Sequence, residues 1–253
     1  MKGSKWLYAL ASFALAIGLW QLVIIVGDYP EALFPGPLAV LEKWWALVAD
    51  GSLFVHIGVS LYRFIIGYGS AVIVAIIAGV LLGRLPRVWA LIDPVVQVIR
   101  PVSPIAWSPF IVLWFGIGDM PAIVIIFIAA FFPVLLATVA AVNRIDPLYL
   151  KVASNFELSQ KDLIWKIILP AAFPAIGSGL HMAIGSAWIF LVAGEMVGAQ
   201  SGLGYLIVDA RNALDLDTVL AAIVTIGVIG LALDHLLRIF ENAIKKVWTG
   251  KTI

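Results

Sequence analysis

The sequence contains no cysteine, and charged residues are scarce in it. The absence of cysteine excludes disulfide bonds, thiolate catalysis and metal sites built on thiolates. Only 12% of the 253 residues are charged, against roughly 25% in soluble domains, whereas 63% are hydrophobic. A net charge of +1 argues against nucleic acid as a partner. Together with a mean hydropathy of +1.08, these figures indicate an integral membrane protein.

The sequence also lacks the motifs that an ATP-driven pump or an intramembrane enzyme needs. No Gly-x-x-x-x-Gly-Lys-Ser/Thr loop is present to hold phosphates, so we expect no nucleotide on this chain. Asp234 and His235 are the only close polar pair in an apolar stretch, and helix neighbours point about 100° apart. We therefore predict no catalytic residue, no metal site and no bound cofactor.

The chain consists mainly of apolar segments that are long enough to cross a membrane, for which about 20 residues suffice. The first segment is longer than the ~7–15 apolar residues of a signal peptide and lacks a small-x-small cleavage site, so we expect it to be retained. The predicted fold class is an all-α polytopic membrane protein. Its six predicted spans cover residues 6–27, 57–83, 90–116, 121–142, 175–197 and 218–238.

Small residues recur at every fourth position in two of these spans. Such a stripe lets helix backbones approach closely in lipid, so it predicts helix interfaces. Residues 38–48 form a tryptophan-containing pattern that suits a helix at the membrane surface. A short helix is expected in the glycine-rich stretch 198–217. The two stripes consist of Gly67, Ala71, Ala75, Gly79 and Gly83, and of Gly179, Ala183 and Ala187.

The longest polar interruption is residues 146–174, which are predicted to form two short helices and a turn. Asp146 followed by Pro147 is a helix-start signal, and Ser159 followed by Asp162 approximates a capping box. Pro170 is expected to end the second helix. A capped helix pair of this kind between membrane spans predicts a docking site for another protein.

Basic residues set the expected orientation. They lie at both ends of the chain, after the second span and in the polar loop, whereas the intervening loops hold mainly acids. By the positive-inside rule, both termini and the polar loop are predicted to be cytoplasmic. The basic residues are Lys2, Lys5, Arg84, Arg87, Arg144, Lys151, Lys161, Lys166, Lys245, Lys246 and Lys251.

The polar loop resembles the cytoplasmic loop of ABC-importer permeases. That signature reads Glu-Ala-Ala, three residues, Gly, nine residues, Ile-x-Leu-Pro. Ala153 and the final Ile167, Leu169 and Pro170 match it. Three positions depart from the signature: Lys151 replaces Glu, Val152 replaces Ala, and Glu157 replaces Gly. The resemblance implies ATPase-coupling residues at Lys151, Val152, Ala153, Ser154, Asn155, Glu157, Leu158, Ser159, Ile167, Leu169 and Pro170.

Most of the chain, about residues 33–217, is similar to the permeases of nitrate, sulfonate, taurine and bicarbonate importers. LFPGPLAVLEKWW, RPVSPIAWSPFIVLWFGIGD and LVAGEM with SGLGY carry this resemblance. It implies a type I ABC importer (MetI-like) fold, with residues 1–253 as one permease domain. Residues 1–55 would hold the first span and an outer interfacial helix. Residues 56–246 would be the core, with the coupling loop at 143–170.

The resemblance also implies partners and a location. The expected partners are a second copy of the chain, two ABC ATPase subunits, an extracytoplasmic solute-binding protein and membrane lipid. ATP and Mg would be bound by the ATPase, and the site of action would be a bacterial inner membrane. The cargo would be an oxyanion such as nitrate, a sulfonate, taurine or bicarbonate. The alternatives are a vitamin or pyrimidine precursor, or a passive channel.

Candidate residues for the substrate pathway come from polar groups inside the spans. Span 90–116 is broken by prolines, and irregular backbone at that depth is tolerated only beside protein or water, so Arg100 is expected to face a cavity. Its positive charge suits an anion, with Ser103 as a donor and Trp107 as an apolar wall. The alternative is a structural role, in which Arg100 pairs with a carboxylate such as Glu195 or with backbone carbonyls that the prolines leave free.

His181 and Glu195 complete the set of pathway candidates. His181 either takes part in the pathway or makes a hydrogen bond between helices. Glu195 is expected to gate, to pair with Arg211, or to reach the membrane interface. Asp234 and His235 are expected to do no more than pair with the basic loop.

Overall fold

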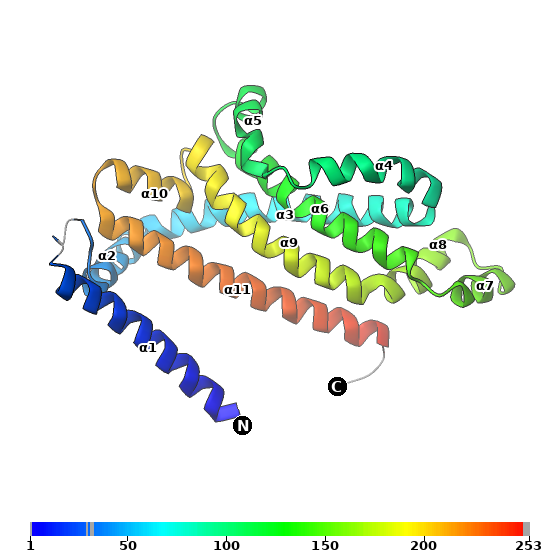
Figure 1. Ribbon diagram of the computed structural model, residues 1–253, viewed down its shortest axis with the longest axis horizontal. Helices are drawn as coiled ribbons and strands as arrows, with labels where there is room; N and C mark the ends of the chain where they lie inside the picture. The colour runs from blue at the N-terminus through cyan, green and yellow to red at the C-terminus, as the bar shows by residue number, and fades with distance from the viewer. Residues whose placement is uncertain (1, 29, 31–32, 250–253) are drawn as a thin grey trace.

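The computed structural model describes residues 2–28, 30 and 33–249, and these residues form helices with no strand among them. Figure 1 shows an elongated bundle in which the long helices run roughly along one axis. The predicted all-α class is therefore confirmed. The helices long and apolar enough to cross a membrane are α1 (Lys2–Gly27), α3 (Ser52–Arg84), α6 (Asp119–Asn143), α9 (Leu169–Gly198) and α11 (Leu216–Thr249).

Helix α6 lies between α3 and α9 and is the centre of the bundle. Both neighbours cover it, which agrees with a sequence that is apolar on all sides. The predicted small-residue stripe of α3 is buried against α6, and that of α9 is buried as well. A Cβ on Gly79 would lie 2.6 Å from the Cβ of Thr138, and one on Gly179 would lie 2.5 Å from the Cβ of Ala137. Glycine at these positions therefore permits the close approach that the stripes predicted.

The predicted third span is not one helix. It consists of α4 (Pro86–Ile99), the short η1 (Pro104–Trp107) and α5 (Ser108–Phe115), with a bend of 85° between α4 and the rest. Pro101 and Pro104 supply no N–H, and each disfavours a helical conformation in the residue before it. Helix α5 projects from the side of the bundle (Figure 1). Within the described residues, the number of spans reaches six only if α4 and the η1–α5 pair are counted together as one span.

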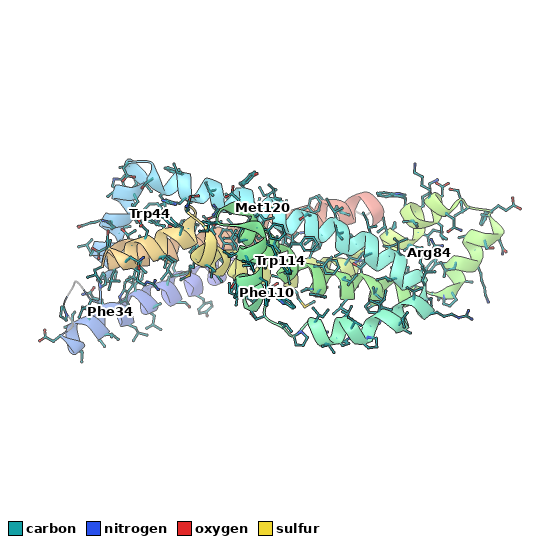
Figure 2. All side chains as sticks on the ribbon, turned by 90° about the horizontal axis from the view of Figure 1, so that it is seen from above. Phe34, Trp44, Arg84, Phe110, Trp114 and Met120 are labelled. Atoms are coloured by element: carbon teal, nitrogen blue, oxygen red, sulfur yellow. The ribbon has the colours of Figure 1, made fainter. Side chains whose placement is uncertain are left out.

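Short helices mark the two ends of the bundle. At one end lie α2 (Pro37–Ala49), which is the predicted interfacial helix, and the expected short helix α10 (Leu203–Asn212). The indole of Trp44 in α2 donates a 3.0 Å hydrogen bond to Thr225 in α11. Figure 2 shows Trp44 near this end, whereas Arg84 lies toward the other, which carries the polar loop. Residues 2–6, 9 and 245–249 have no described side chains, and Lys251 lies outside the described residues.

The polar loop forms α7 (Pro147–Asn155) and α8 (Gln160–Asp162), as predicted. Both predicted caps are present: Asp146 accepts from the amide of Leu148 at 2.8 Å, and Ser159 accepts from that of Asp162 at 3.1 Å. The prediction that Pro170 ends the second helix is wrong. The helix continues through a wider π-helical segment, η2 (Leu163–Ile168), and Pro170 falls in the first turn of α9. Proline supplies no N–H, and it lies where π-helical hydrogen bonding gives way to α-helical hydrogen bonding within a continuous helix.

Candidate functional site

The predicted coupling residues divide into an exposed and a buried set. Ala153 is only 3% exposed and packs within the chain, and its coupling role stays a prediction. The exposed apolar side chains of α7 and its C-cap are Leu148, Tyr149, Leu150, Val152 and Phe156, and three of them, Leu148, Val152 and Phe156, follow one another at spacings of four residues. Lys151, Val152, Ser154, Asn155, Glu157 and Ser159 are exposed, whereas Leu158, Ile167, Leu169 and Pro170 are partly buried.

Glu157 stands where the loop signature has glycine, and its backbone conformation shows why glycine is usual there. Its φ is +50°, in the left-handed region, just after α7 ends. Glycine is the usual residue at such a position because it has no Cβ to clash. The backbone here therefore keeps the shape that the signature glycine permits, although the residue is Glu. Arg84 at the end of α3 donates a 2.6 Å hydrogen bond to Gln160, which ties the loop to a third helix.

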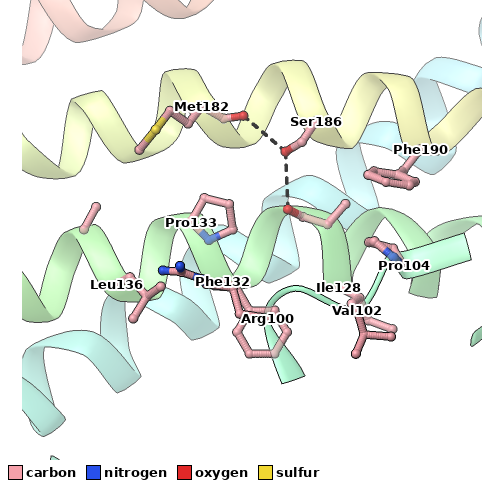
Figure 3. Close-up of a pocket in the computed structure, with 12 residues that line it drawn as sticks. Arg100, Val102, Pro104, Ile128, Phe132, Pro133, Leu136, Met182, Ser186 and Phe190 are labelled. Atoms are coloured by element: carbon pink, nitrogen blue, oxygen red, sulfur yellow. Dashed lines mark hydrogen bonds between the residues drawn. The ribbon is translucent and has the colours of Figure 1, made fainter. Parts of the chain in front are cut away.

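Arg100 lines a cavity of about 560 Å³, as predicted, between the α4–η1 loop, α6 and α9. Figure 3 shows side chains from these three segments meeting around it. The hydroxyl of Ser186 on α9 donates to the carbonyls of Ala129 and Met182, at 3.3 and 3.1 Å, so its proton is already engaged. Ser103 and Trp107 are not among the lining residues, so the expected donor and apolar wall do not come from them.

Glu195 is buried in a network at the other end of the core helices. Its carboxylate lies 2.8 Å from the guanidinium of Arg63 on α3, and both residues are only 1% exposed. Ser60 and the amide of Gly204 also donate to Glu195, at 2.8 Å each. The expected pairing with Arg211 and the expected reach to the interface are therefore wrong. So is the alternative pairing with Arg100.

Arg63 was not among the candidates predicted from the sequence, although it joins more segments than any predicted site residue. It also pairs with Asp119 at the start of α6, at 2.6 Å, and donates to the carbonyl and hydroxyl of Ser201 in the loop before α10. The signal was available, because Arg63 is an ionisable residue inside a predicted span. Arg63 therefore holds the loop before α10 against α3 and α6.

His181 bridges α9 and α11. Its Nε2 lies 2.9 Å from Glu241 and its Nδ1 lies 3.4 Å from Asp234. The structure therefore agrees with the alternative in which His181 makes a hydrogen bond between helices. Asp234 also accepts from Arg238 at 3.0 Å, so the expectation that it pairs with the basic loop is wrong.

These features define a multi-pass membrane protein with a cavity between its core helices and an amphipathic segment exposed at one end. The chain belongs to the family described as "Binding-protein-dependent transport system inner membrane component", which it matches over residues 71–246. The predicted family is therefore confirmed. The chain is an ABC permease of a binding-protein-dependent importer, and it is placed with multi-pass proteins of the inner membrane.

Two curated relatives illustrate the similarity. The chain is 32% identical over 248 residues to the taurine transport system permease protein TauC of Escherichia coli, covering 96% of this chain and 90% of TauC. It is 37% identical over 245 residues to the nitrate import permease protein NrtB of Leptolyngbya laminosa, covering 93% and 86%.

A solved structure supports the fold alone. An inward-facing structure of the MetNI methionine ABC transporter aligns with a TM-score of 0.57 at 17% identity. The alignment covers 82% of this chain and 98% of that one. The predicted MetI-like architecture is confirmed by this match.

Proposed function

We propose that two copies of this chain form the membrane pathway of an ATP-driven importer. Two ABC ATPase subunits, which bind the ATP and Mg, dock on α7 from the cytoplasm, where both chain termini also lie. A solute-binding protein delivers the cargo at the end that carries α2 and α10. The cargo is an oxyanion of the nitrate, sulfonate, taurine or bicarbonate kind.

The observation that carries this proposal is the apolar ridge on α7, formed by Leu148, Val152 and Phe156. These side chains are 62%, 43% and 76% exposed in a segment too polar to lie in lipid. An exposed apolar face on a capped helix marks a protein contact, since helices dock by residues at such spacings. Because α7 joins α6 to α9, a push on the ridge acts directly on two core helices.

A second copy of the chain is supported by the uncovered apolar face of α5 and the residues that follow it. Leu113, Trp114 and Ile117 are all at least 70% exposed in the single chain. Figure 2 shows Trp114 and Phe110 midway along the molecule on this face. Irregular backbone within a membrane needs protein or water beside it, and a second copy would supply this cover.

The class of cargo is supported by two independent facts. TauC and NrtB are named for taurine, which carries an anionic sulfonate group, and for nitrate, which is an oxyanion. Arg100 also places a positive charge at the cavity between the core helices. A neutral vitamin or pyrimidine precursor would make no use of that charge.

The proposal is tested by placing an acidic side chain on the apolar ridge. The variant Phe156→Asp, reconstituted with its ATPase and binding protein in proteoliposomes, should lose at least about 30-fold of ATP-dependent taurine or nitrate uptake, since interface anchors contribute about 2 kcal/mol or more. Leu85→Asp is the matched control, because Leu85 is exposed at the same end but outside α7. It should change uptake less than twofold.

Normal ATP-dependent uptake by Phe156→Asp would contradict docking at the ridge. Equal solute flux with and without ATP in the unmodified protein would show a passive channel instead. Ala153→Arg is not a suitable test, because a buried alanine would report on packing.

A further inference from the structure

Figure 1 shows the turn between α10 and α11 at the end of the molecule that carries α2. This turn holds Leu214. We infer that Leu214 is an anchor for the solute-binding protein, which covers it with an apolar pocket rimmed by basic side chains. The inference rests on the proposed function, because it specifies how one of the proposed partners binds. It is supported by the backbone conformation of Leu214, by its exposure and by the charges around it.

The backbone at Leu214 is strained. Its φ is +59°, in the left-handed region, one residue after Ala213, the C-cap of α10. Glycine is the usual residue there, and Asn or Asp tolerates the conformation because a short polar side chain can bond the backbone. Leucine offers no such compensation. The other non-glycine residues with a positive φ in the described part of the chain are Asp28 and Glu157, and both are polar. A strained apolar residue at a turn points to a role of its side chain.

The side chain of Leu214 lies outside the packed part of the chain. It is 81% exposed, the highest value among the large hydrophobic side chains that the structure describes. Polar neighbours keep it out of the hydrocarbon, because Arg211 and Asn212 are exposed just before it and Asp215 follows it. An apolar side chain held in water gains free energy when a partner covers it, so this exposure favours a protein contact.

The turn is ordered before any partner binds. The amide of Asp215 donates to the carbonyl of Ala210 at 2.9 Å, and the carboxylate of Asp215 accepts from the hydroxyl of Thr218, also at 2.9 Å. The same carboxylate lies 2.8 Å from the ammonium of Lys43 on α2. Leu214 is therefore presented on a fixed backbone, and docking on it costs little conformational entropy.

The segments at this end of the molecule carry an excess of acidic charge. Residues 37–52 and 203–217 hold five acidic side chains and two basic ones. Glu42 and Asp209 are exposed, and neither forms an ion pair with another described residue. An apolar pocket with a basic rim complements this surface, whereas anionic lipid headgroups do not. The proposed ATPases dock on α7 at the opposite end, so the solute-binding protein is the proposed partner that fits. The acids are Glu42, Asp50, Asp209, Asp215 and Asp217, and the bases are Lys43 and Arg211.

The first test uses the absence of cysteine from the chain, since Leu214→Cys then places a single thiol at the turn. The importer is reconstituted in nanodiscs with its ATPase, and a charged, membrane-impermeant maleimide is added with and without the solute-binding protein that supports uptake. Mass spectrometry reads the modification. The thiol should react readily alone and at least about tenfold more slowly under saturating binding protein. Leu85→Cys is the control, because Leu85 is exposed at the opposite end, and its rate should not change.

Variants that keep the turn separate the side chain from the backbone. Leu214→Asn removes the apolar contact but suits the left-handed conformation, so the unfolding midpoint of the chain should stay the same or rise. The Kd of the binding protein should nevertheless increase at least about tenfold, as expected from the loss of one buried leucine side chain. Leu214→Met should change the Kd less than about threefold. Glu42→Gln combined with Asp209→Asn should make the association rate less sensitive to salt.

The inference is overturned if Leu214→Asn binds the solute-binding protein as tightly as the unmodified chain, or if that protein leaves the introduced thiol fully reactive. Slow modification without the binding protein would also overturn it, because lipid or a second copy of the chain would then cover the turn. An association rate of the unmodified chain that does not depend on salt would contradict the basic rim.

The two proposals fail separately. A binding protein that docks without Leu214 would leave the importer in place, since uptake and docking at α7 are measured independently with Phe156→Asp. Absence of ATP-dependent uptake with any binding protein would instead contradict the importer itself.

Discussion

Two arginines inside the membrane-spanning region show opposite solutions to the problem of a charge in that environment. Arg63 is buried against Glu195 and Asp119, and every contact holds loop and helices together. Arg100 sits at a break in the chain, lines a cavity and has no acidic partner among the described residues. A buried and fully paired charge indicates structure, whereas an unpaired charge at a cavity indicates a ligand.

The largest expected effect separates these roles. Arg63→Leu should lower the free energy of unfolding by about 3–5 kcal/mol, because Glu195 is left as a buried unpaired charge. Arg100→Leu should change it by less than about 0.5 kcal/mol, since the residue is exposed and has no partner to strand. The measurement is unfolding by dodecyl sulfate titration in bicelles.

A double variant adds a stricter test of the same comparison. Arg63→Leu with Glu195→Leu should recover most of the loss, because an apolar replacement of a buried pair removes the stranded charge. If the double variant is as unstable as the single one, the loop contacts of Arg63 outweigh the pair. If Arg100→Leu is equally destabilising, the contrast between the two arginines is wrong.

The packing of α3 on α6 gives the next largest effect. Gly79→Val should destabilise the bundle by about 1–3 kcal/mol, since the added side chain would enter Thr138 of α6. Gly69→Val on the same helix is the control, because a Cβ there meets nothing within 4 Å. Equal unfolding midpoints for the two variants would show that α3 does not pack on α6 by its glycine stripe.

His181 is an intermediate case between the two arginines. Glu241 is 5% exposed, and only one of its carboxylate oxygens has a partner, which is His181. His181→Phe should therefore destabilise by about 1–2 kcal/mol, because it leaves a buried acceptor unpaired. His181→Gln should lose less, since the amide can still donate. Equal losses for Phe and Gln would assign the effect to shape and not to the hydrogen bond.

The local features were predictable because they depend on short sequence spacings. The spans, the small-residue stripes and the caps at Asp146 and Ser159 follow from composition and periodicity, and the structure contains them. The cavity position of Arg100 was predictable for the same reason, since prolines around it break the helix in a known way.

The pairings between helices were not predictable, because they depend on which faces meet. Glu195 was expected to meet Arg211 or Arg100, yet it meets Arg63, more than 130 residues away. The loop signature likewise did not reveal that Ala153 turns inward while Phe156 turns outward. Pro170 was misread because a π-helical segment before it lets the helix continue.

The smallest expected effect comes from an ion pair near the surface, at the end of the molecule that carries α2. Lys43 lies 2.8 Å from Asp215, and both side chains are about one-third exposed, at 36% and 32%. Burial raises the pKa of Asp215, but hydrogen bonds from Lys43 and Thr218 outweigh it, so the pKa lies below its ordinary value of 3.8. A depressed pKa means that the pair stabilises the fold above about pH 4, and that this contribution is lost as the pH falls through the folded pKa.

Lys43→Met, which keeps the length of the side chain, should therefore destabilise by only about 0.5 kcal/mol at pH 7, since solvent screens such pairs. The difference from the unmodified protein should shrink below about pH 4 and also in 1 M salt, where the Debye length is about 3 Å. The penalty of Arg63→Leu should remain in 1 M salt, because that pair is shielded from solvent. If salt abolishes both penalties, the ion pair of Arg63 and Glu195 is accessible to solvent ions and is not shielded by the bundle.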